Sequence, residues 1–292
     1  MALTLLASLL AFGIAHAVAD LVRLRDWRWF GRYVLALTPK LSRDGLAAAL
    51  ALGVLLAPPV LLLAVFWWWI AGALFGLLSL IVGVAVLFVT LGPRDLDLDL
   101  RDWLRASDPA ERDASAQALN AAPGSRAMGL IEPVFGEALK RWFGPLFWFI
   151  AFGPAGALLY RLTALLADDD RLGERLSPDQ REFAGILLLA LGWLPAHLMA
   201  LALALASDFD AVSRAWREHH QRHGQGLFHL DLDFLAATAR ACIDADDIEE
   251  DIDADLPTAA QDEPVRQAHG LIRRILVVWF VALAVLVLAG AG

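Results

Sequence analysis

The chain has 292 residues, of which 59% are hydrophobic and 20% charged, with a formal net charge of −9 at pH 7. A mean hydropathy of +0.57 is typical of a polytopic membrane protein and excludes an ordinary soluble domain. The basic residues flank apolar runs and a single cysteine, Cys242, is present, so nucleic acid is not expected as a partner and an intrachain disulfide is excluded.

Six apolar runs are long enough to cross a hydrocarbon core of about 30 Å. We therefore predict an all-α polytopic membrane protein with one integral membrane domain over residues 1–292, spans broken by Gly and Pro, and helical cytoplasmic loops. The predicted transmembrane helices cover approximately residues 1–19, 46–66, 70–92, 142–165, 183–207 and 275–291.

The first run ends in Ala15-His16-Ala17, as a secretory signal peptide would, but it lacks a basic start, and we predict a retained helix. The second and third runs form a predicted hairpin, because residues 45–93 carry no charge. Pro58-Pro59 predicts a kink in its first helix, and the aromatic run 66–69 is typical of the headgroup level of a bilayer.

Basic residues predict the orientation of the chain. The segments 20–45, 93–141 and 207–274 hold six, seven and seven Lys or Arg residues, whereas 167–182 holds three and Arg161 ends the span before it. Cytoplasmic loops are enriched in Lys and Arg. We therefore expect the three basic segments to be cytoplasmic, and 167–182 and both termini to lie outside the cytoplasm.

Residues 142–160 form a run of nineteen uncharged residues with two Gly-Pro pairs. Each proline removes a backbone donor, and irregular backbone at membrane depth persists only where protein or a water-lined cavity surrounds it. We predict that this run is buried in the bundle beside a ligand cavity, and that the fifth span is interrupted at Pro195. The residues expected to line the cavity are Pro145, Trp148, Gly153, Pro154, Gly156, Tyr160, Arg161, Trp193 and His197.

Three Asp residues alternate with Leu directly after the third span, at Asp95, Asp97 and Asp99. In an extended segment they would share one side, where Mg²⁺ with a phosphate ligand could bind. The alternative is a polar exit from the membrane whose Leu side chains pack against it.

His219 and His223 lie four residues apart on a predicted helix and could form a metal pair, but no further ligand is implied by the spacing and a solvated helix end is the preferred interpretation. Residues 244–255 contain eight carboxylates and are interpreted as a solvated tether, with a Ca²⁺ or Mg²⁺ site as the alternative. The intramembrane histidines His16 and His197 are either functional or hydrogen-bonded across helices. The chain contains no phosphate-binding glycine loop, GxSxG, HExxH or CxxC motif.

Five segments of the sequence resemble the AmpE branch of the family that also contains the CobD/CbiB cobalamin-biosynthesis proteins. The similarity covers nearly the full length and is most specific between residues 132 and 210. The segments are Pro145–Trp148, Gly153–Arg161, Gly192–His197, Ser207–Asp210 and Gly270–Trp279.

The chain differs from the cobalamin enzymes in three segments that carry signatures of those enzymes. The cobalamin enzymes join adenosylcobyric acid to an aminopropanol or its phosphate. Asp26–Trp29 stands where those enzymes carry an Asp-Pro…His-Pro-Val signature, Gly136–Arg141 where they carry Glu-Asn-Thr-Ser-Asp-Gly, and Ala164–Ala167 where they carry Asn-Thr-Leu-Asp. The resemblance thus implies that the scaffold is kept and the ligase site is lost.

The resemblance implies a non-catalytic regulatory or sensory protein of the bacterial inner membrane, linked to β-lactamase induction. Its implied partners are the lipid bilayer, a cytoplasmic cell-wall recycling or signalling protein and a second copy of the chain, with no cofactor. Two alternatives stay open. One is a CobD/CbiB-like ATP-dependent amide ligase or related ligase using Mg²⁺ and a nucleotide, and the other is a small-molecule transporter, which broken spans would suit.

Overall fold

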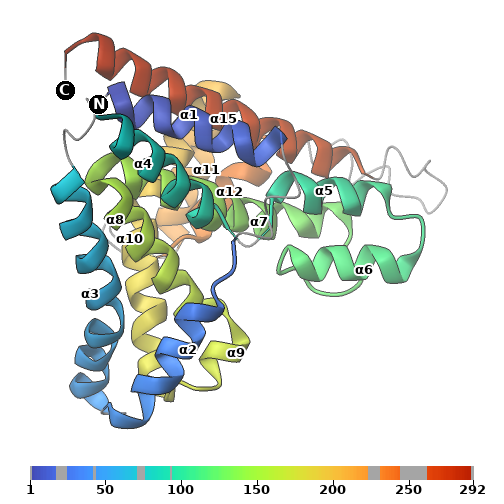
Figure 1. The fold of residues 1–292 in the computed structure, drawn as a ribbon. Helices are drawn as coiled ribbons and strands as arrows, with labels where there is room; N and C mark the ends of the chain where they lie inside the picture. The colour runs from blue at the N-terminus through green and yellow to red at the C-terminus, as the bar shows by residue number, and fades with distance from the viewer. Residues whose placement is uncertain are drawn as a thin grey trace. The chain divides into compact units, whose positions relative to one another are not determined.

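The computed structural model describes residues 2–17, 25–41, 44–70, 76–92, 94–222, 231–243 and 262–290. All regular secondary structure in these residues is helical (Figure 1). Together with the apolar composition, this confirms the predicted class: the chain is an all-α, multi-pass membrane protein.

Within the described residues, four helical runs are long and apolar enough to cross a membrane. These are α3 (Gly45–Ile70), the run Ala127–Asp168, α10 (Pro178–Ala206) and α15 (Glu263–Leu288). The apolar window of Ala127–Asp168 is 72% buried and that of α3 only 22%, so the span with two Gly-Pro pairs is enclosed by protein, as expected.

The run Ala127–Asp168 has three parts: α7 (Ala127–Ala138), the π-helical segment η4 (Leu139–Phe143) and α8 (Gly144–Asp168). Two of the predicted spans, 1–19 and 70–92, contain shorter apolar helices, α1 (Ala2–Ala17) and α4 (Leu77–Thr90).

The helices group into two compact units. The first contains residues 1–93, 144–192 and 286–292. In this unit α8 packs against α3 and α4, and α1 packs against α4. Its core joins Phe30 of α2 to leucines of α3 and α8. The remaining helical elements of this unit are α2 (Arg28–Leu37), η2 (Thr38–Lys40) and α9 (Asp170–Gly173).

The second unit contains residues 94–143 and 193–285, and it includes the second half of α10 and most of α15. In this unit α12 packs against α7 and α11, and α5 packs against α6. The described parts of the segments 93–141 and 207–274, which were predicted as cytoplasmic, are thus largely helical, as expected. Their helices are α5 (Leu96–Arg105), α6 (Pro109–Ala118), α7, α11 (Phe209–Arg222) and α12 (Asp233–Ala241).

The predicted interruption at Pro195 is wrong, because α10 is continuous from Pro178 to Ala206. A proline has no N–H for the carbonyl four residues before it, which here is that of Leu191. The indole Nε1 of Trp148 donates a hydrogen bond to this carbonyl at 2.9 Å. A side chain from α8 thus supplies the donor that Pro195 lacks.

The same arrangement occurs at Pro58-Pro59, through which α3 is continuous. Pro58 leaves the carbonyl of Val54 without its helical donor. The hydroxyl of Tyr33, on α2, donates to that carbonyl at 3.2 Å.

One part of the predicted orientation is wrong. The backbone N–H of Gly45, at the start of α3, donates to Asp179 near the start of α10 at 2.6 Å. Leu172 and Leu176 share a core cluster with Phe30 of α2. The start of α3 and the start of α10 therefore lie at the same end of the first unit. The segments that lead into these two helices cannot end on opposite faces of a membrane, as the prediction for 20–45 and 167–182 requires. The count of basic residues did not reveal that the two segments lie together, because both of them contain basic residues.

Candidate functional site

The helix α8 consists of two helical segments that meet at Phe152 and Gly153. Gly153 has φ 66° and ψ −158°, a conformation that is essentially restricted to glycine. Pro154 follows as the first residue of the second segment, where a missing N–H is tolerated. The first pair, Gly144-Pro145, does not interrupt the helical run, because α8 follows directly on η4 there. Of the two Gly-Pro pairs, only the second one interrupts the helix.

The glycines of α8 allow close packing. A Cβ placed on Gly156 would overlap the carbonyl oxygen of Trp148, and a Cβ on Gly144 would overlap the ring of Tyr160. Tyr160 is 1% exposed and Arg161 5% exposed. Protein atoms therefore fill the space next to these predicted cavity residues.

Seven of the nine predicted cavity residues lie together on α8, and Trp148 and Tyr160 pack in a cluster with Leu188 of α10. The other two, Trp193 and His197, belong to the second unit. The ring centroid of His197 lies 4.2 Å from that of Trp193 and 4.4 Å from that of Phe234. The His197 Nδ1 is 2.7 Å from the carbonyl oxygen of Trp193 and, because a carbonyl only accepts, must be the donor. His197 is thus a hydrogen-bonded histidine within an aromatic cluster.

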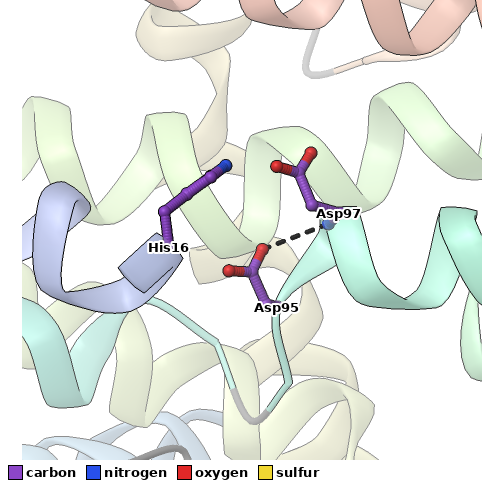
Figure 2. A group of neighbouring side chains, drawn as sticks. All are labelled: His16, Asp95 and Asp97. Atoms are coloured by element: carbon purple, nitrogen blue, oxygen red, sulfur yellow. Dashed lines mark hydrogen bonds between the residues drawn. The ribbon is translucent and has the colours of Figure 1, made fainter. Parts of the chain in front are cut away.

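Asp97 and Asp99 lie in the helix α5 and Asp95 directly precedes it, so the predicted extended segment is wrong. Asp95 is the N-cap of α5, and its carboxylate accepts a hydrogen bond from the backbone N–H of Asp97 at 3.1 Å (Figure 2). His16, also labelled in Figure 2, is a residue of the other unit. Asp is among the preferred N-cap residues because it satisfies an otherwise unpaired amide of the first turn. This cap explains why a helix begins at Leu96.

The side chains of Asp95, Asp97 and Asp99 are nevertheless buried, at most 4% exposed. Asp97 accepts hydrogen bonds from His269 Nε2 at 2.5 Å and from Arg273 at 3.0 Å. His269 and Arg273 are four residues apart, on one face of α15. Asp97 thereby connects α5 to α15.

Asp99 faces a different cation, Arg141 of η4. The Arg141 guanidinium donates to Asp99 at 2.5 Å, to Glu137 at 2.6 Å and to the carbonyl of Ala118 at 2.6 Å. Asn120 donates to the second carboxylate oxygen of Glu137 at 2.5 Å. Asp99 therefore connects α5 to the α7–η4 segment, in the same way that Asp97 connects it to α15.

We call Asp97, Asp99, Glu137, Arg141, His269 and Arg273 the buried ion cluster. Burial raises the pKa of Asp99, and the Arg141 guanidinium opposes this rise. Without Arg141, Asp99 and Glu137, which are 1% and 6% exposed, would keep only the more exposed Arg94 and Lys140 as cations, at 3.0 and 3.9 Å. We expect this loss to cost about 3 kcal/mol, the lower end of the range for breaking a buried ion pair.

The buried ion cluster does not fit the predicted Mg²⁺ site as it is arranged. Oxygen atoms of Asp97 and Asp99 already face guanidinium and imidazole groups at 2.5–3.0 Å. Mg²⁺ needs carboxylate and water oxygens in near-octahedral geometry, so these cations would first have to be displaced. Such an arrangement is suited to holding three helical segments together rather than to acid–base chemistry.

The predicted His219 and His223 pair is only partly described. His219 Nε2 lies 3.1 Å from Asp231, which connects α11 to the segment before α12. His223 and the acidic run 244–255 lie outside the described residues. Within the part of the chain that the structure covers, His219 joins no group of three side chains able to hold a metal ion.

Four members of the buried ion cluster were not predicted from the sequence. Glu137 and Arg141, like His269 and Arg273, are four residues apart, and this spacing places each pair on one helix face. That spacing was the available signal. Their carboxylate partners are 42 and 176 residues away for Arg141 and Arg273, which no local pattern shows.

Comparison with known proteins shows one family and one relative to which the chain is similar. A family model described as "Regulatory signalling modulator protein AmpE" matches residues 4–223. The chain is also 30% identical over 196 residues to a "Cobalamin biosynthesis protein CobD" of Chromobacterium violaceum. That alignment covers 60% of this chain and 57% of the relative, so the chain spans just over half of that relative's length. No solved structure matches the chain.

Proposed function

Because the chain belongs to the AmpE family of regulatory signalling modulators, we propose that it is a non-catalytic regulator of β-lactamase induction in the inner membrane of a Gram-negative bacterium. Its cytoplasmic segments would report to a protein of cell-wall recycling or signalling. The transmembrane bundle would hold these segments, either in one chain or in a homo-oligomer.

The observation that carries this proposal is the pairing within the buried ion cluster. Catalytic carboxylates need access to substrate and a pKa suited to proton transfer. Here Asp97 and Asp99 are 2% and 1% exposed and face cations from two different helical segments. A displacement of α15 or η4 would therefore also displace α5. Such coupling suits a protein that passes a conformational change from one segment to another.

The test is induction of β-lactamase in cells whose own gene is replaced by a variant. Asp97→Asn removes the charge that faces His269 and Arg273 but keeps the side-chain shape. We expect altered induction at an unchanged amount of protein in the membrane. Arg101→Gln, an exposed position on the same helix, is the matched control and should behave as wild type. Unaltered induction in both the Asp97→Asn strain and a deletion strain would reject the proposal.

For the orientation we propose that 93–141 and 207–274 face the cytoplasm. A span between residues 141 and 167 and another between 182 and 207 would each change the side of the membrane, so 93–141 and 207–274 would lie on the face opposite to 167–182. These two segments contain seven and seven basic residues, against six and three in 20–45 and 167–182. The expected periplasmic N-terminus depended on a cytoplasmic 20–45, so we propose a periplasmic position for the C-terminus alone.

Single cysteines test this orientation in a Cys242→Ser background. Burial raises the pKa of the Cys242 thiol, so the native cysteine should itself react slowly. Glu174→Cys should react with a membrane-impermeant maleimide in intact cells with a permeabilised outer membrane. Gln117→Cys, exposed on α6, should react only after lysis. The reverse pattern would overturn the assignment.

A ligase remains the second candidate, because a named cobalamin-biosynthesis protein is 30% identical over 196 residues. A nucleotide with Mg²⁺ would have to displace Arg141 or Arg273 from the aspartates. Equilibrium binding of ATP or a corrinoid to the purified full chain decides between the candidates. Affinity abolished by Asp97→Asn or Asp99→Asn would favour the ligase, and no binding would favour the regulator.

A further inference from the structure

We propose that the aromatic cluster around His197 is an acid-sensitive joint, which holds α10 to α11 and α12 only while the imidazole is neutral. Three helices of the second unit supply the cluster: α10 gives Trp193 and His197, α11 gives Trp216 and α12 gives Phe234. The ring centroids of Trp216 and Phe234 lie 5.3 and 4.4 Å from that of His197. We call these four side chains the histidine joint.

The hydrogen bond of His197 fixes the position of its proton. Nδ1 donates to the carbonyl oxygen of Trp193 at 2.7 Å, so the lone pair of the neutral imidazole is on Nε2. This Nε2 is shielded from solvent and has no hydrogen-bond partner among the residues that the structure describes. Protonation would place a second N–H and a positive charge among aromatic rings. The attraction of the rings for a cation is smaller than the cost of removing an unpaired charge from water.

Two other histidines of the same unit have the opposite surroundings. His269 Nε2 lies 2.5 Å from Asp97, and His219 Nε2 lies 3.1 Å from Asp231. A proton added to either imidazole would strengthen its pairing with the carboxylate. Acid should therefore favour the contacts of His219 and His269 and oppose the packing of His197.

A second imidazole, that of His220 on α11, adds to the effect of acid. Its Nδ1 donates to the carbonyl oxygen of Trp216 at 2.9 Å, and its ring stacks on that indole with centroids 6.1 Å apart. The ring of Phe234 also lies 6.1 Å from it. Because His197 and His220 lie beside the same two rings, their positive charges would repel each other.

The charged groups of the surrounding helices do not supply a counter-ion. Residues 183–206 of α10 contain no charged residue. Within the described part of the chain, no carboxylate forms a hydrogen bond or ion pair with His197 or His220. The charged side chains that the structure describes on α11 and α12 are exposed to solvent: Asp210, Arg214, Arg217, Glu218, Asp233 and Arg240.

Cys242 can report whether the joint is closed. It is the single cysteine of the chain and lies at the C-cap of α12. Its Sγ lies 3.2 Å from the hydroxyl of Ser207, between α10 and α11. If α12 separates from α10, this contact breaks and the thiol becomes accessible. Local openings of this kind are measured by the reactivity of the protected group.

The experiment measures the rate at which 4,4′-dithiodipyridine reacts with Cys242 in the full chain in a neutral detergent. Division by the rate in the unfolded chain at the same pH gives a protection factor that does not depend on thiol ionisation. At one pH unit below the ordinary pKa of histidine, about 6.5, an open joint gains about tenfold for each imidazole that must stay neutral. Wild type should therefore lose at least about tenfold in protection between about pH 8 and about pH 5.5.

Histidine variants identify the sensor. His197→Gln cannot titrate, and its amide can still donate to the Trp193 carbonyl, so its loss of protection should shrink to less than about threefold. His220→Gln should lie between this variant and wild type. The matched control is His219→Gln, which removes the neighbouring imidazole that faces Asp231 and should keep at least the wild-type loss.

Several outcomes would overturn the proposal. Equal protection of wild type at the two pH values would show that the joint is not acid-sensitive. A wild-type loss in His197→Gln would place the titrating group elsewhere, and a loss abolished by His219→Gln alone would move it to the pair with Asp231. If His197→Gln is unprotected even at about pH 8, His220→Gln decides: a loss smaller than that of wild type supports the proposal, and an unchanged loss rejects it.

Discussion

Pro195 and Pro154 lie in neighbouring helices, α10 and α8, yet α10 continues through its proline whereas α8 breaks. In α10 the carbonyl freed by the proline receives a hydrogen bond from Trp148. In α8 the residue before the proline is Gly153, which adopts a backbone conformation that other residues avoid. A proline alone therefore does not decide whether a membrane helix is interrupted. The preceding residue and a nearby side-chain donor decide it.

Trp148 has two roles in this pair of helices, one through its side chain and one through its backbone. Trp148 precedes the break in α8, and its indole supports the continuous helix α10. The carbonyl of Trp148 lies so close to Gly156 that no side chain fits there. Three substitutions test these contacts, and a fourth tests the corresponding bond from Tyr33 to α3. The effect of each is measured as a change in the free energy of unfolding in mixed detergent micelles.

The largest effect should come from Gly156→Ala. The added Cβ would overlap the backbone oxygen of Trp148, which cannot move without shifting the first segment of α8. We expect a loss of about 3 kcal/mol, at the upper end of overpacking costs. Gly185→Ala in α10 is the control, because nothing lies within 4 Å of its Cβ, and it should be neutral or slightly stabilising. Equal effects of the two substitutions would contradict the close approach across the break.

Gly153→Ala tests the backbone conformation of the break. A Cβ there meets only Trp67, at 3.5 Å, so the cost comes from φ 66° and ψ −158° rather than from overlap. We expect a loss of about 2 kcal/mol. Gly53→Ala, on the exposed side of α3, should cost nothing by comparison. Wild-type stability of Gly153→Ala would show that the glycine conformation is not needed for the break.

Trp148→Phe keeps an aromatic ring and removes only the indole donor to Leu191. The carbonyl of Leu191 would then lack a partner in a partly buried position, and we expect a loss of about 1 kcal/mol. A second substitution, Pro195→Ala, restores a backbone N–H for that carbonyl. The double variant should therefore recover most of the loss, and a fully additive result would mean that the indole bond does not compensate for the proline.

The smallest effect should come from Tyr33→Phe. The bond from its hydroxyl to Val54 is exposed and 3.2 Å long, and water or headgroups can replace it. We expect a loss of about 0.5 kcal/mol. A cost as large as that of Trp148→Phe would show that this carbonyl is shielded from water and headgroups.

The helical class and the membrane location follow from long uncharged runs, because only helices or closed barrels can satisfy the backbone in lipid. The boundaries of α3 and α10 were close for the same reason. The α5 helix was mistaken for an extended segment because Asp and Leu alternate there. Leu96, Leu100 and Trp103 are all buried and share one helix face, and with the cap residue Asp95 they were the better signal.

The contacts that make up the candidate sites were not predictable in this way. Arg141 is separated by 42 positions in the sequence from its partner Asp99, and Trp148 by 43 from its partner Leu191. Each pairing depends on how helices pack, while the sequence pattern reports only the face of one helix. The positive-inside count failed in a similar way for 20–45 and 167–182, because it weighs each loop separately and contains no information on which loops meet.

The hydrogen bond between Gly45 and Asp179 has a consequence for biosynthesis. The two residues are separated by 134 positions, which ribosomes translate in on the order of ten seconds. Throughout that interval the first turn of α3 must enter the membrane without its side-chain acceptor. The start of α3 becomes complete only when α10 emerges, so a chain arrested before residue 179 would keep this helix end accessible to proteases after α3 itself has been inserted.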